Sequence, residues 1–169
     1  AFLDNHVRDL VSVDFFTVPT ATFRVLFAFV VLSHDRRRVL HFNVTESPSA
    51  DWAALQIKQA VAFSEPEHGP RYLLRDRDGI YGSEFSRVVE TLGIEEVLSA
   101  ARSPWRNPFC ERVIGSIRRE CLAHVIILNE EHLRRILRSY FAYYHESRTH
   151  LSLDNKDCPV PRAVEPSTM

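Results

Sequence analysis

Apolar and polar positions follow two different periodicities along this chain. Residues 11–18, 23–32 and 38–44 are rich in β-branched and aromatic side chains, and short links such as the one at Pro19 separate them. Such segments are typical of β-strands, and strands joined by short links pair in antiparallel order. The first third of the sequence therefore predicts a three-stranded antiparallel meander.

After residue 44 the pattern becomes helical. Ser47-Pro48 is typical of a helix start, and the alanine-rich segment that follows predicts a helix to about residue 63. Short apolar segments at 72–74 and 94–98 predict two more strands, with a second helix between them. Its apolar face recurs at i, i+3, i+4 and i+7: Phe85, Val88, Val89 and Leu92. We expect Ser83 to cap this helix and Gly93 to end it.

Two longer helices are expected at about residues 108–124 and 131–144, each with one regular apolar face. Several prolines predict an extended tail at residues 154–169. A meander followed by alternating strands and helices predicts an α/β fold, a five-stranded mixed sheet with helices on both faces. A Rossmann fold fits less well, because five glycines in 169 residues supply no glycine-rich first turn. Residues 1–153 are expected to form one domain.

Composition excludes several classes of protein. With 45% hydrophobic residues and a formal charge of -1, the chain is neither disordered nor a uniform polycation. The longest apolar run, residues 25–32, is far shorter than the roughly 20 residues that span a bilayer, so we expect no membrane segment and no signal peptide. Three cysteines without CxxC spacing indicate neither a disulfide scaffold nor a zinc site. These features predict a cytoplasmic protein.

Three acidic residues are the candidates for chemistry. Asp14 lies inside an apolar strand, where its charge requires a divalent cation or an arginine opposite, and the sequence leaves both open. Asp76 follows a short strand, at the end where open α/β sheets bind ligands, although Asp-Arg-Asp-Gly is also ordinary turn composition. Glu111 falls about 100° from the core direction of its helix, with Gly115 and Arg118 on the same stripe. Three such carboxylates would suit Mg²⁺ or Mn²⁺ and phosphoryl transfer.

The order Asp14, Asp76, Glu111 resembles the D, D, E triad of the integrase catalytic core, a family that includes retroviral integrases and insertion-sequence transposases. The interval between the last two, residues 77–110, is one residue shorter than is usual there. Asp78 is a rival second carboxylate, but only Asp76 gives the family's spacing to a tyrosine, here Tyr81. The family's amino-terminal helix-turn-helix has no counterpart, so the chain is expected to be an isolated core or a fragment.

Local motifs extend the resemblance over residues 11–153. Residues 76–85 resemble the family's S-D-x-G-x-x-Y/F segment, and residues 103–111, Ser-Pro-Trp-Arg-Asn-x-x-x-Glu, resemble the loop that leads to the catalytic glutamate. Residues 117–120 resemble the K-R-E that follows. Residues 144–153 are similar to the closing Y-N-x-x-R-P-H-x-x-L, with His145 in place of asparagine and Thr149 in place of proline.

The resemblance implies a ribonuclease H-like fold and a DDE-type transposase or integrase that cleaves DNA and transfers strands during DNA integration. It implies that Asp14, Asp76 and Glu111 are catalytic and hold two Mg²⁺ or Mn²⁺ ions. Mobile-element ends and target DNA would be the partners, and a homodimer or higher multimer is expected on DNA. Six residues are candidates for DNA contact: Arg102, Trp105, Asn107, Arg118, Arg148 and His150. For Trp105 a core-covering role is the alternative, and for Arg148 and His150 a role in anchoring the last helix.

Two other functions stay open at this stage. One is a non-catalytic DNA-binding or assembly domain with a decayed site. The other is a ribonuclease H-like or junction-cleaving nuclease of the same fold, which a substrate preference would distinguish. A phosphoacceptor receiver domain fits poorly, because it requires an acidic cluster beside the first strand that this sequence lacks.

Overall fold

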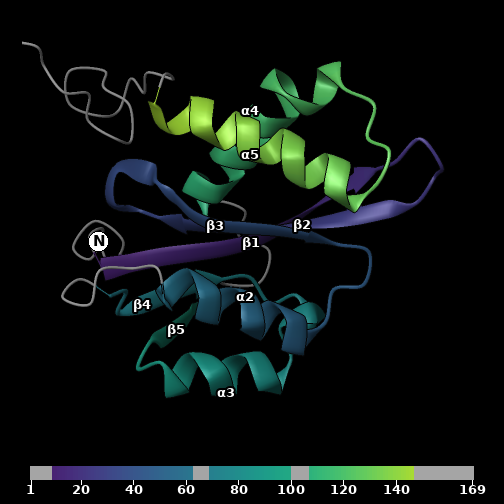
Figure 1. Ribbon diagram of the computed structural model, residues 1–169. Helices are drawn as coiled ribbons and strands as arrows, with labels where there is room; N and C mark the ends of the chain where they lie inside the picture. Colours follow the sequence, from purple (N-terminus) through teal and green to yellow (C-terminus); the bar gives the residue numbers. More distant parts are fainter. Residues whose placement is uncertain (1–8, 63–68, 100–106, 147–169) are drawn as a thin grey trace, which may run out of the picture.

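The computed structural model describes residues 9–62, 69–99 and 107–146, and the structural statements below refer to these residues. A central sheet lies between two layers of helices (Figure 1). Its five strands are β1 (Leu10–Pro19), β2 (Val25–Ser33), β3 (Val39–Thr45), β4 (Tyr72–Arg75) and β5 (Glu95–Leu98). Their order is β3-β2-β1-β4-β5, antiparallel from β3 to β1 and parallel from β1 to β5. The predicted meander and the mixed sheet are therefore confirmed.

The sheet is buried on both faces because helices cover each of them. Helices α2 (Ala50–Ala62) and α3 (Ser83–Thr91) pack on one face, and α4 (Pro108–Glu120) and α5 (Glu130–Glu146) on the other (Figure 1). Successive strand residues alternate between faces, so on β1 Val11 and Val13 enter the first layer and Phe16 and Val18 the second. By the same alternation Asp14 lies on the face that α4 covers.

Two helix starts differ from the sequence expectation. Helix α2 begins at Ala50, and Ser49 rather than Ser47-Pro48 caps it, because its Oγ accepts a hydrogen bond of 3.2 Å from the N–H of Trp52. Ser83 is the first residue of α3 and makes no cap; Gly82 precedes it. Gly93, with φ of 73°, ends α3 as expected.

Two further differences lie at the end of α4 and at the start of β2. The helix expected at 108–124 ends at Glu120, because Cys121 leaves helical geometry before a short 3₁₀ helix, η5 (Leu122–His124). The strand expected from Phe23 starts at Val25, because the Thr20 hydroxyl accepts from the N–H of Arg24 at 3.0 Å and closes a tight turn. Phe23 stands in that turn with φ of 61° and is 96% exposed.

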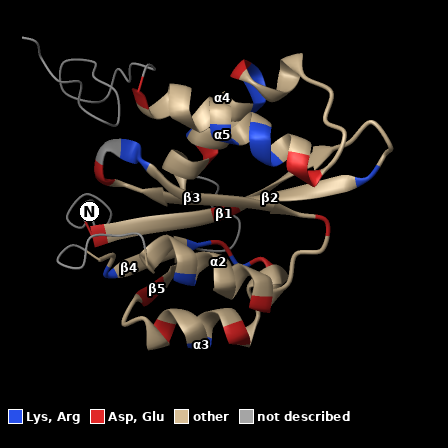
Figure 2. Ribbon diagram, in the orientation of Figure 1, with Lys and Arg blue, Asp and Glu red and all other residues tan. Residues whose placement is uncertain are grey.

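No helix in the described part of the chain is long and apolar enough to cross a membrane. Acidic and basic residues are scattered over both helical layers (Figure 2). The expected tail at 154–169 lies outside the described residues.

A buried polar connection that the sequence did not reveal runs from His34, just after β2, through β1 to α4. His34 Nε2 lies 3.0 Å from Ser12 Oγ, which lies 3.1 Å from Cys110 Sγ, and all three residues are buried. Burial, and then the charge of Arg37, lowers the pKa of His34 to about 4. The imidazole is therefore neutral in the folded protein over a pH range in which the unfolded chain binds a proton.

We predict that His34→Leu removes a source of acid sensitivity. Between pH 6.5 and 4 only the unfolded wild-type chain is protonated at His34, so wild-type stability falls with falling pH by about 3 kcal/mol from this group. The variant's free energy of unfolding, measured by urea titration relative to wild type, should therefore improve by that amount from pH 7 to pH 4. The exposed His124, replaced in the same way, is the control. An equal change for both histidines would contradict the prediction.

Candidate active site

Asp14 and Asp76 occupy equivalent positions on neighbouring strands. The parallel pairing of β1 with β4 ends at Ser12 and Leu74, and each aspartate lies two residues beyond its strand's member of that pair. Asp14 continues along β1, which runs on to Pro19, whereas the chain turns away after Arg75. The two carboxylates therefore lie where the strands diverge, at the edge where open α/β sheets bind ligands.

Helix α4 brings Glu111 to the same region. Cys110, Val113, Ile114 and Ile117 are buried, whereas Glu111 in the first turn is exposed and lies off the buried face of α4. The contact of Cys110 with Ser12 places this first turn on β1, two residues before Asp14. Three residues far apart in the sequence thus lie in one neighbourhood.

The electrostatics of Asp14 show that these carboxylates interact. Burial, and after it the negative charges of Asp76 and Glu111, raise the pKa of Asp14 to about 7. The N–H of Phe15, which donates to Asp14 Oδ1 at 2.8 Å, and the charge of Arg118 act in the opposite direction. Among the described residues no arginine or lysine forms an ion pair with Asp14. The arginine alternative from the sequence is therefore not what this part of the structure contains.

The donor chemistry around Asp14 fits a hard divalent cation, although the side chains do not already form a ligand cage. Carboxylate oxygens are the ligands that Mg²⁺ and Mn²⁺ prefer. Within residues 9–62, 69–99 and 107–146, no three His, Cys, Asp or Glu side chains are close enough together to hold a metal ion as they stand. A cation would nevertheless relieve the mutual repulsion at Asp14.

Two buried polar atoms beside the carboxylates lack partners within the described chain. The hydroxyl of Tyr81, whose residue is only 3% exposed, makes no hydrogen bond, and neither does Asn107 Oδ1. Burial raises the pKa of Tyr81 well above its usual value, and the charges of Asp14 and Asp76 add to this effect. Leaving such groups unsatisfied is costly, so both fit a site that holds a polar ligand.

The ring of Tyr81 is held firmly by its neighbours. It packs on Phe15 and Phe85 with centroid separations of 5.6 and 4.9 Å, and the Arg75 guanidinium lies 5.2 Å from its centroid. Arg75 is only 8% exposed and pairs with Glu96 at 2.9 Å. Its Nη1 also donates to the carbonyl of Asp76 at 3.0 Å, which fixes the start of the turn. The sequence pattern, which indicated an ordinary polar turn, did not reveal this role of Arg75.

The geometry favours Asp76 over Asp78 as the second carboxylate. Asp78 Oδ1 accepts from the N–H of Ile80 at 3.0 Å and caps the 3₁₀ helix η3 (Gly79–Tyr81). Asp76 Oδ1 accepts only a longer bond, 3.2 Å, from the N–H of Asp78. Since the carboxylate of Asp78 is engaged as a cap, Asp76 is the better candidate for a ligand.

Two of the six candidates for DNA contact lie in the described region. Asn107 stands at the start of α4, and its Nδ2 donates to the carbonyl of Val13 at 3.5 Å. Arg118 is exposed two turns after Glu111. Arg102, Trp105, Arg148 and His150 lie outside the described residues, so their roles stay predictions.

Comparisons with known proteins agree with this architecture. The family model described as the integrase core domain matches residues 92–157, which include Glu111, Arg118 and the last two helices. Over these residues the chain is similar to integrase core domains. The resemblance drawn from the motifs is thereby confirmed, and the match reaches beyond the described residues into the closing motif. A search among curated proteins finds no match.

Solved structures of integrase and transposase cores are similar to this chain over most of its length. A chain of the simian T-cell lymphotropic virus intasome, solved in complex with PP2A regulatory subunit B56 gamma, has a TM-score of 0.71 and 14% identity. That match covers 96% of this chain but only 60% of the viral one. The catalytic domain of the Mos1 mariner transposase has a TM-score of 0.70 and 18% identity, covering 83% of this chain and 76% of that one.

The HTLV-2 integrase catalytic core domain, solved with magnesium in a dimeric form, has a TM-score of 0.62 at 10% identity. The match covers 86% of this chain and 90% of the HTLV-2 core. At these identities the similarity establishes the fold, which is the ribonuclease H-like fold of integrase and transposase catalytic cores. The predicted fold class is confirmed.

We predict that Asp14→Asn stabilises the metal-free protein at neutral and higher pH. The raised pKa means that ionised Asp14 opposes folding, a penalty that is absent below about pH 4, grows between pH 4 and 7 and is constant above that range. After allowance for partial solvent exposure, the variant should gain about 2 kcal/mol over wild type at pH 8 in a chelator. Urea titrations at pH 4 and 8 measure the difference. Equal stabilities of the variant and wild type at pH 8 would show that ionised Asp14 does not destabilise the folded protein.

We further predict that Tyr81→Phe raises stability in the absence of divalent metal. The variant keeps the ring contacts and removes a buried hydroxyl that has no partner in the described chain, so unfolding free energy should rise by about 1 kcal/mol. Tyr140→Phe is the matched control, because the Tyr140 hydroxyl donates to Glu120 Oε2 at 3.0 Å and its loss should lower stability. Thermal unfolding in a chelator measures the stability of each variant relative to wild type. A loss of stability in both variants contradicts the prediction.

Proposed function

We propose that this chain is the catalytic core of a DDE-type polynucleotidyl transferase, a transposase or integrase that cleaves DNA and transfers its strands. The observation that carries the proposal is that the charges of Asp76 and Glu111 act on the partly buried carboxyl of Asp14, where β1 and β4 diverge. The integrase-type fold supports it, because Mos1 transposase and the retroviral integrases share that architecture. The chain spans only 60% of the viral intasome protein, so activity, DNA substrates and partners belong to this proposal.

Asp14, Asp76 and Glu111 are the residues that would hold Mg²⁺ or Mn²⁺, and we propose two ions. Mos1 transposase has been solved with each of these metals and the HTLV-2 core with magnesium, which supports the choice. When bound, such ions supply Lewis-acid stabilisation of the attacking and leaving oxygens in an in-line phosphoryl transfer. The carboxylates hold them without forming a covalent intermediate with the substrate.

The other side chains near the site would bind the DNA substrate and orient its reacting groups. Arg118 offers a positive charge close to Asp14 without an ion pair to it, so it can neutralise a DNA phosphate. The Tyr81 hydroxyl can donate a hydrogen bond to an oxygen at the carboxylates, and Asn107 Oδ1 can accept a hydrogen bond from a water or a strand-end hydroxyl. Arg102, Trp105, Arg148 and His150 complete the proposed DNA contacts.

We propose mobile-element ends and target DNA as partners, with the chain acting as a multimer. The Mos1 strand transfer complex and the dimeric HTLV-2 core support this assignment. A cytoplasmic location stays a prediction from the composition.

We predict that the chain nicks supercoiled plasmid DNA and joins strand ends only when Mg²⁺ or Mn²⁺ is present. Asp14→Asn, Asp76→Asn and Glu111→Gln should each lower the rate at least about a hundredfold, because each removes a ligand charge while keeping shape. Gel assays of nicking and joining measure the rates, and thermal unfolding with added Mn²⁺ reports ion binding separately.

Two exposed acidic residues provide matched controls. Asp78→Asn changes the neighbouring carboxylate, and Glu90→Gln changes one on the outer helix α3; both should keep nearly full activity. Metal-dependent nicking that survives all three site substitutions would overturn the proposal. Nicking of RNA–DNA hybrids or junctions in place of strand joining would instead identify a ribonuclease H-like nuclease.

A further inference from the structure

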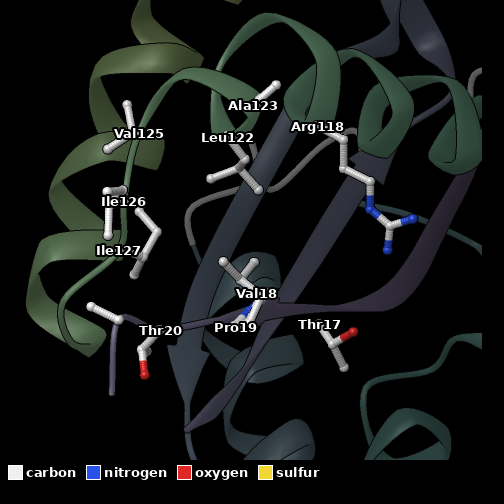
Figure 3. Close-up of a pocket in the computed structure, with 11 residues that line it drawn as sticks. Thr17, Val18, Pro19, Thr20, Arg118, Leu122, Ala123, Val125, Ile126 and Ile127 are labelled. Atoms are coloured by element: carbon white, nitrogen blue, oxygen red, sulfur yellow. The ribbon is translucent and has the colours of Figure 1, made fainter. Parts of the chain in front are cut away.

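A groove opens between the end of β1 and the segment that follows α4, with Arg118 in its lining. Its volume is about 460 Å³, within the range of small-ligand sites and too small to seat a helix. Figure 3 shows two walls, one from the end of β1 and the turn after it, the other from the end of α4 and the chain to residue 127. The lining residues are Thr17, Val18, Pro19, Thr20, Ala21, Arg118, Leu122, Ala123, Val125, Ile126 and Ile127.

The groove is apolar along most of its length and cationic at one end. Val18, Leu122 and Ile127 form the apolar part, whereas Arg118 extends from α4 toward the end where Thr17 lies (Figure 3). An occupant must therefore combine a flat or compact apolar body with one negative charge. A nucleotide has this composition, with a base for the apolar walls and a phosphate for the guanidinium.

The cationic end of the groove points to the carboxylates. Arg118 is seven residues after Glu111 on α4, and Thr17 is three residues after Asp14 on β1; either path spans about 10 Å. That is about three nucleotide steps along a stacked DNA strand, at roughly 3.4 Å each. A strand whose phosphate lies at Asp14 would therefore reach the groove within a few nucleotides.

An exposed aromatic side chain stands at the tip of the turn that supplies one wall. Phe23 is 96% exposed, and Ile126 on the opposite wall is 75% exposed. A hydrogen bond of 2.7 Å from the N–H of Ala21 to the carbonyl of Ile127 joins the two walls. Exposed aromatic rings beside a cationic groove are typical of proteins that stack unpaired bases.

We propose that this groove binds one unpaired nucleotide of the DNA strand that carries the reacting phosphate, with its base between the apolar walls and its phosphate at Arg118. The proposal rests on the proposed function and names a part of its substrate. A base inside a duplex cannot enter the groove, so the nucleotide must be frayed, flipped or part of a single-stranded extension. The core would then prefer DNA ends that open easily over uninterrupted duplex.

The test measures binding of the full 169-residue chain to DNA in a chelator, where no cleavage occurs. The probes are a mixed-sequence duplex with blunt ends and the same duplex with a short single-stranded extension, each labelled for fluorescence anisotropy. We expect at least about tenfold tighter binding of the extended duplex. With 2-aminopurine placed at successive positions of the extension, one position should change fluorescence most.

Matched variants locate the bound nucleotide. Ala123→Trp fills the groove and Arg118→Gln removes its cation, so each should abolish the preference for the extended duplex. Ala123→Ser, which adds little bulk, and Arg119→Gln, on the neighbouring exposed residue of the same helix, should keep it. Unchanged thermal unfolding of the variants shows that the fold is retained.

Failure of this proposal is distinguishable from failure of the proposed function. Equal binding of both probes by wild type, or a preference that survives Ala123→Trp, overturns the groove assignment whatever the catalytic assay shows. Loss of a dimer in Ala123→Trp, seen by light scattering without DNA, also overturns it and makes the groove a contact between copies. A variant-sensitive preference without metal-dependent cleavage supports the groove and refutes the catalytic proposal.

Discussion

The end of the β1–β4 pairing is the constraint on which the site depends. Up to Ser12 and Leu74 the strands satisfy each other's backbone groups, and beyond that pair β1 continues while β4 turns away. Asp14 is therefore held in a rigid central strand at the edge of an opening, partly withdrawn from water and facing other negative charges. Burial and the neighbouring negative charges both disfavour the ionised form of Asp14, and its pKa is raised for this reason. The fold can bear the cost of this buried carboxylate because the apolar cores on both sides of β1 hold the strand in place independently of Asp14.

Two separate polar connections hold the carboxylates in place. Arg75 pairs with Glu96 of β5 and donates to the carbonyl of Asp76, so the second carboxylate is positioned from the β5 side of the sheet. The contact of Ser12 with Cys110 positions the first turn of α4, and with it Glu111, from the β1 side. Buried polar groups of this kind specify one arrangement more than they add stability. The geometry of the site is thus set by residues that do not themselves carry its charge.

The sequence predicted what depends on local periodicity and missed what depends on distant partners. The β-branched and aromatic composition of residues 11–18 and the i, i+3, i+4, i+7 face of α3 are local, so the strand β1 and the helix α3 were correctly predicted. The apolar run predicted a strand from Phe23, but the turn closed by Thr20 delays its start to Val25. Ser49, and not the predicted Ser47, caps helix α2. His34 and Arg75 acquire their roles only through partners elsewhere in the chain, which no spacing reveals. Glu111 was placed correctly because its angle on α4 follows from helix geometry alone.

DNA binding by this core must depend on local positive charge and not on the net charge of the chain. A formal charge of -1 gives no long-range attraction to a polyanion, and the carboxylates repel phosphate directly. The positive charge of Arg118 offsets that repulsion at Asp14. The Arg118 side chain also lines the neighbouring groove. Because Arg118 makes no ion pair with a described acidic residue, its guanidinium keeps its donors for a phosphate. One arginine can therefore couple the occupancy of the groove to the electrostatics of the carboxylates.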